Sequence, residues 1–396
     1  LAALSNESTM LKDVTAFDDV EHMVNGLCEL GFDVQWNDAK TEILINGVTS
    51  SGGERPTSSI FCGNSGTAVR FLTALACLVP GEWTITGDEH MQKRPIQPLV
   101  DALKTLGAEI ECETGCPPLT VKGGTIRGGT IELDSSKSSQ YLTALLLIGH
   151  ALPEGLSINL PEKSTSQSYV DLTVQCLKDF GIEVTNTDTT YEILSQNGCH
   201  PERRRGATRV AHDDDRGSKT RSANTNIYHI EGDWSAAASF IALAELTGGR
   251  CQFTNLKPTS LQGDSNLPKA IAALRGDGDR EINCEGFPDQ LMTLAVLAAR
   301  RIGKTVLKGA ANLRHKECDR LAVITRELSK AGIDIEETED GVIVNNLKAN
   351  SSELSPASLD PEHDHRMAFA FGVLGSLFDG IEIQNAQCVA KTYANF

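Results

Sequence analysis

The sequence predicts an α/β protein of two domains, each assembled from three units in which strands and helices alternate. Two observations carry this prediction: the length of 396 residues and a unit of about 75 residues that recurs along the chain. Domains usually hold about 100–200 residues, so the length suggests two to three of them. Hydrophobic residues make up 40% and charged residues 22% of the chain, which is typical of a globular protein and excludes a disordered or fibrous one.

The first kind of helix in the unit is amphipathic and ends at a glycine that leads into an extended segment. The pattern predicts this helix at residues 17–30, 98–106, 169–180 and 321–331, with a weaker copy at 267–275. The glycines that follow are Gly31, Gly107, Gly181, Gly332 and, after the weaker copy, Gly276. Each is expected to adopt the left-handed conformation that caps the C-terminus of a helix.

The second kind of helix is short, rich in Ala and Leu, and opened by a polar cluster. It is predicted at residues 67–79, 140–149, 235–246, 290–300 and 367–378. A strand is expected after each copy, at residues 83–86, 156–159, 251–254, 305–308 and 381–384. We expect the N-terminal domain to span residues 1–229 and the C-terminal domain residues 230–396.

Residues 197–222 interrupt the pattern. They contain Glu-Arg-Arg-Arg and Asp-Asp-Asp and almost no apolar side chains, so we expect a solvated loop or a disordered insert near the domain boundary. Residues 1–4 are predicted to be the tail of a small-residue helix, and residues 393–396 stop where another helix is expected. We therefore expect the sequence to be clipped at both ends.

The net charge of −17 argues against nucleic acid as a partner, because phosphate backbones require a basic surface. Apolar runs stay below the roughly 18 residues that a membrane span needs, and no signal peptide is recognisable at the N-terminus. The 11 cysteines are scattered singly, which favours reduced thiols in a cytoplasmic protein. Only Cys112 and Cys116 lie close together, and no second pair completes a zinc site.

Two openings of the small-residue helices are candidate ligand sites. Asn64, Gly66 and Thr67 belong to a glycine-rich run, and Ser138-Ser139-Gln140 places three hydrogen-bonding side chains at one helix start. Helix N-termini favour anions because their N–H groups are free and the helix dipole is positive there. Helix capping without a ligand is the structural alternative for both openings.

Cationic side chains gather at other junctions between loops and helices. Arg94, Arg366 and Lys391 lie at such junctions, and Lys316 and Arg320 are spaced one helical turn apart. Taken singly, each is an ordinary solvated charge or cap. Together, in an acidic protein, they favour a small substrate that carries phosphate and carboxylate groups, which arginine grips with two parallel hydrogen bonds. His363 and His365 have no third clustered ligand, so no zinc site is expected.

Eight runs in order along the chain carry a family resemblance: GNSGTAVR, KRPIQPLVDALKTLGAEI, SSKSSQYLTALLL, SQSYVDLT, FPDQLMT, NLRHKECDRL, HDHRMAFAF and CVAKT. They resemble the 5-enolpyruvylshikimate-3-phosphate (EPSP) synthases, over nearly the whole chain except about residues 197–222. The resemblance implies the two-domain enolpyruvyl transferase fold, with three βαβαββ-type repeats around buried helices in each domain. It also implies a monomer without metal or organic cofactor.

The reaction implied by the resemblance transfers the enolpyruvyl group of phosphoenolpyruvate to the 5-hydroxyl of shikimate 3-phosphate and releases phosphate. This step belongs to the shikimate pathway, which leads to chorismate and the aromatic amino acids. The implied residues for shikimate 3-phosphate are Thr67, Ser138, Ser139, Gln140, Ser166, Tyr169, Asp289, Asn312 and Lys316. Those for phosphoenolpyruvate are Asn64, Gly66, Arg94, Gln140, Arg320, Arg366 and Lys391.

The implied chemistry is attack of the 5-hydroxyl on C2 of phosphoenolpyruvate while C3 gains a proton. Asp289 is the candidate base for the hydroxyl and Glu317 the candidate acid for the methylene carbon, while Lys316 stabilises charge on the phosphate. Because the two ligand shells lie on different domains, we expect binding to close the cleft and expel water.

One family segment, containing Pro-Gly-Ser-Lys-Ser, is expected just before Leu1 and supplies a lysine, a serine and an arginine. Loss of one preorganised donor costs about 10²–10³ in rate, so a chain beginning at Leu1 is expected to be nearly inactive. Two alternatives stay open. One is a catalytically impaired descendant of the fold. The other is the transferase that acts on UDP-N-acetylglucosamine, although the cysteine usual in its loop before Arg-Pro is missing from residues 87–94.

Overall fold

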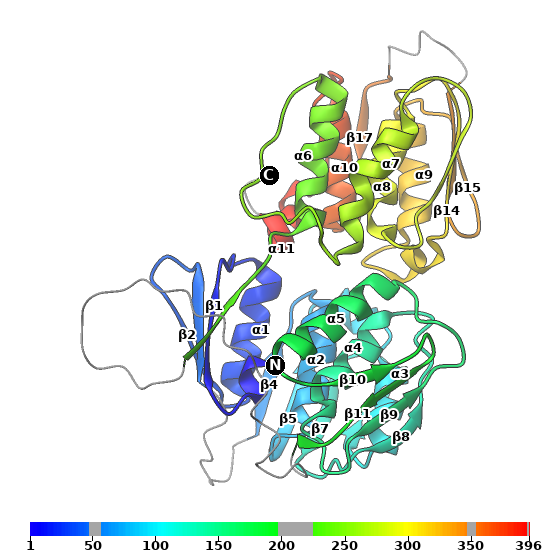
Figure 1. Cartoon of the computed structure of the whole chain (residues 1–396). Coiled ribbons are helices and arrows are strands. Elements are labelled where there is room, and N and C mark those ends of the chain that lie inside the picture. Colours follow the sequence, from blue (N-terminus) through cyan, green and yellow to red (C-terminus); the bar gives the residue numbers. More distant parts are fainter. Residues whose placement is uncertain (47–56, 197–224, 347–353, 394–395) are drawn as a thin grey trace.

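The computed structural model describes residues 1–46, 57–196, 225–346, 354–393 and 396, and the predicted insert at 197–222 lies outside them. Two separate hydrophobic cores are present among these residues. The first is built from residues between Ala2 and Ile193, and the second from residues between Ala238 and Leu374. The molecule therefore has two halves, stacked one above the other in Figure 1.

The first half contains three four-stranded sheets of the same design. Their strand orders are β12-β1-β3-β2, β4-β5-β7-β6 and β10-β11-β9-β8. In each sheet one pair is parallel (β1 with β12, β4 with β5, β8 with β9) and the other neighbours are antiparallel. The strands are β1 (Ser8–Lys12), β2 (Asp33–Trp36), β3 (Glu42–Asn46), β4 (Ser58–Phe61), β5 (Gly81–Thr86), β6 (Glu109–Glu111), β7 (Leu119–Gly123), β8 (Gly129–Glu132), β9 (Leu156–Asn159), β10 (Val184–Asn186), β11 (Thr190–Ile193) and β12 (Thr225–His229).

The helices of this half alternate with the strands. They are η1 (Ala2–Leu4), α1 (Asp18–Glu29), α2 (Gly66–Ala76), η2 (Met91–Lys93), α3 (Gln97–Thr105), α4 (Ser139–Gly149) and α5 (Gln167–Asp179). The order β4-α2-β5-α3-β6-β7 is one complete βαβαββ repeat, and β8-α4-β9-α5-β10-β11 is a second. The first sheet differs, because its parallel partner β12 comes from the far end of the half.

Among the described residues, the second half repeats the design only in part, with one four-stranded sheet of the same order and one two-stranded sheet. Its elements are α6 (Trp234–Thr247), η5 (Gly263–Asn266), α7 (Leu267–Leu274), β13 (Arg280–Asn283), η6 (Pro288–Gln290), α8 (Leu291–Ala298), β14 (Gly303–Lys308), η7 (Ala311–His315), α9 (Arg320–Lys330), β15 (Ile335–Glu337), β16 (Val342–Asn346), β17 (Ala357–Leu359), α10 (His365–Gly375), β18 (Ile381–Ile383), η8 (Ala386–Val389) and α11 (Ala390–Tyr393). The sheets are β13-β14-β16-β15 and β17-β18.

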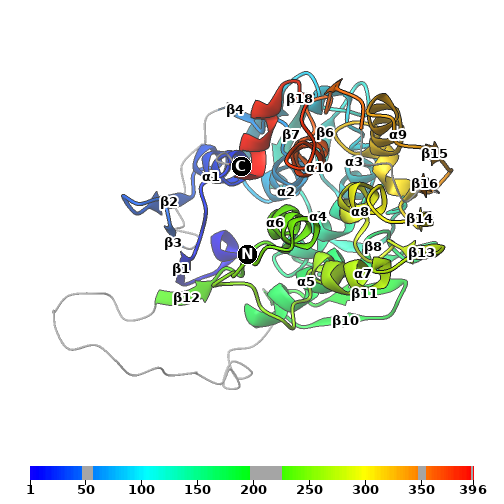
Figure 2. The same ribbon diagram turned by 90° about the horizontal axis from the view of Figure 1, so that it is seen from above.

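The small-residue helices form the centre of each half. Nearly all side chains of α2, α4 and α8 are buried, and α2 packs against α4, which in turn packs against α5. Ala and Leu suit this position because small and flexible apolar side chains allow helices to pack closely on all sides. Seen from above, these helices lie toward the middle of the molecule and the sheets lie toward its outside (Figure 2). The predicted α/β fold with buried helices is confirmed.

The glycine caps are confirmed at Gly31, Gly107, Gly181 and Gly332, whereas Gly276 does not cap α7, because Arg275 before it is already extended. The φ angles of the five predicted glycines lie between +74° and +96°, which is the left-handed region. The predicted strand at residues 251–254 is wrong. These residues are irregular and mostly exposed, because no described strand lies beside them to complete a hydrogen-bonding ladder.

The described cysteines are all free thiols. No helix among the described residues is both long enough and apolar enough to cross a membrane.

Candidate active site

Several polar contacts join the two halves where their helix N-termini face one another. The amide Nδ2 of Asn312 donates to Ser166 Oγ at 3.0 Å, and Tyr169 Oη donates to Asp289 Oδ2 at 3.4 Å. Arg94 Nη1 lies 3.8 Å from the carboxylate oxygen Oε1 of Glu317. The predicted residues of the two halves therefore meet in one place.

Arg320, the first residue of α9, is the centre of an ion network. Its side chain is only 1% exposed. Its Nε donates to Asp364 Oδ2 at 2.6 Å, its Nη1 to Asp289 Oδ1 at 2.8 Å, and its Nη2 to Glu317 Oε2 at 2.8 Å. A buried charge is stable only when it is paired and hydrogen-bonded, and the three carboxylates satisfy this requirement.

Three further cations surround the same carboxylates. Lys316 Nζ lies 3.4 Å from Asp289 Oδ1, and Arg366 Nη2 lies 3.5 Å from Asp289 Oδ2. The ammonium of Lys391, in α11, donates to Glu317 Oε1. Lys316 precedes α9 in an extended conformation, so the prediction that it lies one helical turn from Arg320 is wrong. The network brings the two side chains together through Asp289 instead.

This network determines the charge state of the two candidate catalytic carboxyls. Burial raises the pKa of Asp289, but the positive charges of Lys316, Arg366 and Arg320 outweigh burial and hold that pKa well below its usual range. In Glu317 burial is likewise overcome by the surrounding cations, above all Lys391, and its pKa is well below normal. Both side chains are therefore carboxylates at neutral pH.

Arg94 approaches this network from the first half. Its side chain is 9% exposed, and its Nε and Nη1 atoms have no hydrogen-bond partner among the described residues. Its Nη2 lies against Gly66, where an added Cβ would be 2.9 Å from it. A buried guanidinium with unused donors indicates a binding position for an anion.

The polar openings of α2 and α4 lie in the same half. Ser138 Oγ accepts the backbone N–H of Gln140 at 3.3 Å, so its capping role is confirmed. The hydroxyls of Thr67 and Ser65 are 3.3 Å apart, and the buried Oδ1 of Asn64 has no partner among the described residues. Within the described part of the chain, Thr67, Ser138 and Ser139 are not brought into direct contact with the ion network.

Ser166 precedes α5 in a left-handed conformation, with φ of +52°. This conformation is uncommon for serine and marks a constrained position. The Ser166 hydroxyl makes no cap to its own helix and accepts the Asn312 amide from the other half. Ser166 therefore presents its hydroxyl to the interface between the halves.

Sequence reasoning missed five residues at or beside the site. Asp19 lies within electrostatic reach of Lys391, and Arg366 Nη1 lies 3.9 Å from Asp264 Oδ2. The other three are Arg70, Asp364 and His365. Asp364 caps α10 through the N–H of Arg366 and also holds Arg320. Burial lowers the pKa of His365 well below its usual value, and the positive charge of Lys391 lowers it further. Asp364 and His365 belong to the polar cluster that opens the predicted helix at 367–378, and that cluster was the signal that could have found them.

No group of three or more His, Cys, Asp or Glu side chains suited to a metal ion occurs in the described ranges.

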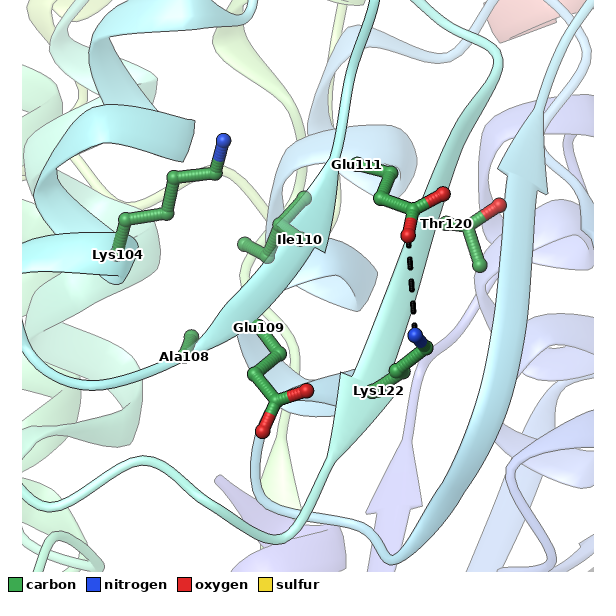
Figure 3. A pocket seen from close by; sticks show the side chains of 7 residues that line it. All are labelled: Lys104, Ala108, Glu109, Ile110, Glu111, Thr120 and Lys122. Carbon is green, nitrogen blue, oxygen red and sulfur yellow. Dashed lines mark ion pairs between the residues drawn. The ribbon is translucent and has the colours of Figure 1, made fainter.

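Among the described residues, two of the pockets differ in their distance from the site chemistry. One, of about 260 Å³, is lined by residues of α3, β6 and β7, including the Lys122–Glu111 ion pair (Figure 3). None of its lining residues belongs to the ion network or carries a buried polar atom without a partner. The other, of about 240 Å³, lies beside the network, since Tyr169, Asp264 and Ser235 line it. The second pocket is therefore the one that adjoins the candidate catalytic residues.

Comparison with known proteins gives consistent results. A family model described as EPSP synthase (3-phosphoshikimate 1-carboxyvinyltransferase) matches residues 1–396. The 3-phosphoshikimate 1-carboxyvinyltransferase of Vibrio atlanticus (strain LGP32) is 33% identical over 413 residues, covering 100% of this chain and 91% of the relative. The enzyme of that name from Serratia proteamaculans (strain 568) is also 33% identical, with 100% and 90% coverage. A solved EPSP synthase from Acinetobacter baumannii superimposes with a TM-score of 0.72 at 25% identity, covering 99% of this chain and 89% of that one.

Proposed function

The chain belongs to the EPSP synthase family, and from this premise we propose that it transfers the enolpyruvyl group of phosphoenolpyruvate to the 5-hydroxyl of shikimate 3-phosphate, releasing phosphate. This is a transferase reaction of the shikimate pathway, toward chorismate and the aromatic amino acids. The observation that carries the proposal is the buried guanidinium of Arg94, which has unused donors and faces the Arg320 network across the interface.

Phosphoenolpyruvate binds between the two halves in this proposal. Arg94 and Gly66 contact it from the first half, together with Asn64 and Gln140. Arg320, Arg366 and Lys391 contact it from the second half. The substrate carries a phosphate and a carboxylate, and these anions compete with Asp289 and Glu317 for the same cations. Before substrate binds, the buried cations are therefore stabilised by their ion pairs with Asp289 and Glu317.

Shikimate 3-phosphate binds next to it. Ser138, Ser139, Gln140 and Thr67 offer hydroxyl, amide and backbone N–H groups at the openings of α2 and α4, where an anion is favoured. Ser166 and Tyr169 contact the substrate from α5. The second half adds Asp289, Asn312 and Lys316. The hydrogen bond of 3.0 Å between Asn312 and Ser166 supports closure of both halves around this substrate.

The charge states support the assignment of Asp289 as the base, because a base must be ionised before it accepts a proton. Substrate anions that bind Lys316 and Arg366 reduce the positive field on Asp289 and so raise its pKa toward a useful value. Glu317 must first gain a proton to act as the acid. Anions at Lys391, Arg320 and Arg94 raise the pKa of Glu317 by the same effect, so protonation of this carboxylate follows substrate binding.

The wider assignments rest on simpler observations. Both ligand shells come from one chain, which supports a monomer, and the separate hydrophobic cores support domains of residues 1–229 and 230–396. The net charge of −17 supports small anionic substrates held locally by cations and not nucleic acid. The free thiols of the described cysteines support a cytoplasmic location for the protein.

The test measures phosphate release with phosphoenolpyruvate and shikimate 3-phosphate, beside calorimetric binding of each. We expect binding of phosphoenolpyruvate that is strengthened by shikimate 3-phosphate, and we expect any phosphate release, however slow, to require both substrates. Arg94→Gln should abolish phosphoenolpyruvate binding, whereas Arg127→Gln, in the connection between β7 and β8, should not. Release with UDP-N-acetylglucosamine in place of shikimate 3-phosphate, or no binding of either substrate, would overturn the proposal.

A further inference from the structure

Arg70 is a buried cation in α2 that the proposed reaction does not use. Its side chain is 3% exposed. Its Nη1 donates to Gly66 O at 3.1 Å and to Gln140 Oε1 at 2.6 Å, and its Nη2 donates to Pro95 O at 3.1 Å. These acceptors belong to the three segments of the first half that carry the proposed phosphoenolpyruvate residues. Arg70 therefore connects the three segments that form one binding site.

The contact with Gln140 fixes the orientation of its carboxamide. A guanidinium has only donors, so the Gln140 atom at 2.6 Å from it must be the carbonyl oxygen. The NH₂ end of the carboxamide must then point away from Arg70. This leaves the N–H groups of Nε2 as the donors that the carboxamide can offer to a ligand.

The Arg70 guanidinium itself lies close to that of Arg94. A Cβ atom added to Gly66 would be 2.7 Å from Arg70 Nη1 and 2.9 Å from Arg94 Nη2, so both guanidiniums lie against the same glycine. Arg70 also holds the carbonyl of Pro95, the residue after Arg94, and Tyr141 Oη donates to the same carbonyl at 2.7 Å. The ring of Tyr141 lies 5.3 Å from the Arg70 guanidinium carbon and helps to hold it.

We propose that Arg70 is a positioning residue that turns Gln140 into a hydrogen-bond donor for phosphoenolpyruvate. Arg70 touches no substrate and acts through the Gln140 carboxamide. With the opposite orientation the carbonyl oxygen of Gln140 would face the substrate anion and repel it. The inference rests on the proposed function, because it assigns a task within that same site.

A double-mutant cycle tests the inference. The variants are Arg70→Lys, Gln140→Ala and their combination, and the measurement is the Kd of phosphoenolpyruvate by calorimetry at saturating shikimate 3-phosphate. The Arg70→Lys substitution keeps the positive charge but removes the paired contacts. We expect it to raise the Kd about tenfold in the wild-type background and less than about twofold in the Gln140→Ala background. A role as structural support alone predicts equal losses in both.

Arg301→Lys is the matched control. Arg301 is another buried guanidinium that donates to backbone carbonyls, those of Leu274 and Gly276, but it lies away from the interface. Its substitution should lower Tm and leave the Kd unchanged.

A measurement on the wild-type protein covers the case in which Arg70→Lys does not fold. In the ¹⁵N spectrum of the glutamine side chains, the NH₂ signals absent from Gln140→Ala are those of Gln140. We expect these signals to shift when phosphoenolpyruvate binds. Unshifted signals, or equal Kd losses in both backgrounds, would overturn the inference alone. A wild-type chain that binds neither substrate would overturn the proposed function, and the inference with it.

Discussion

The guanidinium Nη1 of Arg320 lies 2.8 Å from the carboxylate oxygen Oδ1 of Asp289, although 31 residues separate them in the chain. Both side chains are almost completely buried. Asp364 and Glu317 accept hydrogen bonds from the same guanidinium, so one arginine bridges three carboxylates at the start of α9. Arg320 thus connects the stretch of residues 317–320 with Asp289 and Asp364, which come from two other parts of the second half.

We expect Arg320→Met to lower the free energy of unfolding by about 3–5 kcal/mol at pH 7, because it leaves three buried carboxylates without the guanidinium that they share. Urea titration measures this change. The control is Arg326→Met in the same helix, whose side chain is 48% exposed and whose partner Glu327 keeps its contact with Lys330. That variant should lose less than about 1 kcal/mol. Equal losses in the two variants would contradict the central role of Arg320.

His150, at the end of α4, predicts a pH dependence of stability. Burial lowers its pKa from 6.5 to about 4. The unfolded chain therefore binds the proton more tightly, and stability is lost as pH falls from 6.5 toward 4. The loss amounts to about 3 kcal/mol at its limit. Urea titrations across this range should show a shallower slope for His150→Gln, and parallel curves for the two proteins would refute the prediction.

Gly66→Ala tests the close approach of the two guanidiniums to α2. The new methyl group would displace Arg70 and Arg94, since it would lie less than 3 Å from a nitrogen of each. We expect the Kd of phosphoenolpyruvate to rise about tenfold, which corresponds to about 1.4 kcal/mol, with little change for shikimate 3-phosphate. Gly286→Ala is the control, because a Cβ there meets nothing within 4 Å. An unchanged Kd for Gly66→Ala would show that the guanidiniums move without consequence.

Ser166 and Ser168 offer a matched pair at the start of α5. Ser166 Oγ accepts the Asn312 amide, whereas Ser168 Oγ donates to the carbonyl of Gly286 at 3.1 Å. We expect Ser166→Ala to raise the Kd of shikimate 3-phosphate about tenfold, because it removes a proposed ligand contact. Ser168→Ala should change it less than about threefold. Calorimetry distinguishes the two, and a larger effect at Ser168 would argue against the assignment of Ser166.

The parts of the fold that the sequence predicted correctly are governed by local chemistry. Gly31, Gly107 and Gly181 adopt left-handed caps because a helix end followed by an extended segment requires that conformation there. Ser138 and Asp364 cap helices for a similarly local reason. These features depend on a few neighbouring residues, so the sequence pattern is sufficient to find them.

The features that were predicted wrongly or missed depend on contacts between segments that are distant in the sequence. Residues 251–254 alternate like a strand, but a strand also needs a neighbour, and none of the described strands provides one. Asp364 was recognised as part of a helix opening but not as the partner of Arg320, 44 residues earlier. Arg70 was visible at the end of the glycine-rich run, yet only the packing of α2 against α4 reveals its contact with Gln140. Such pairings require the tertiary structure.

The parallel pairing of β1 with β12 has a consequence for the order of folding. Ser8 pairs with Thr225, so the two strands are 217 residues apart in the chain (225 minus 8). The other two sheets of the first half each use strands from one contiguous stretch and can form during synthesis. In the first sheet only the addition of β12 to β1 must wait, because closing so long a loop is slow. Until β12 arrives, β1 presents an open edge, and a nascent chain stopped before residue 225 would be most prone to aggregate at that strand.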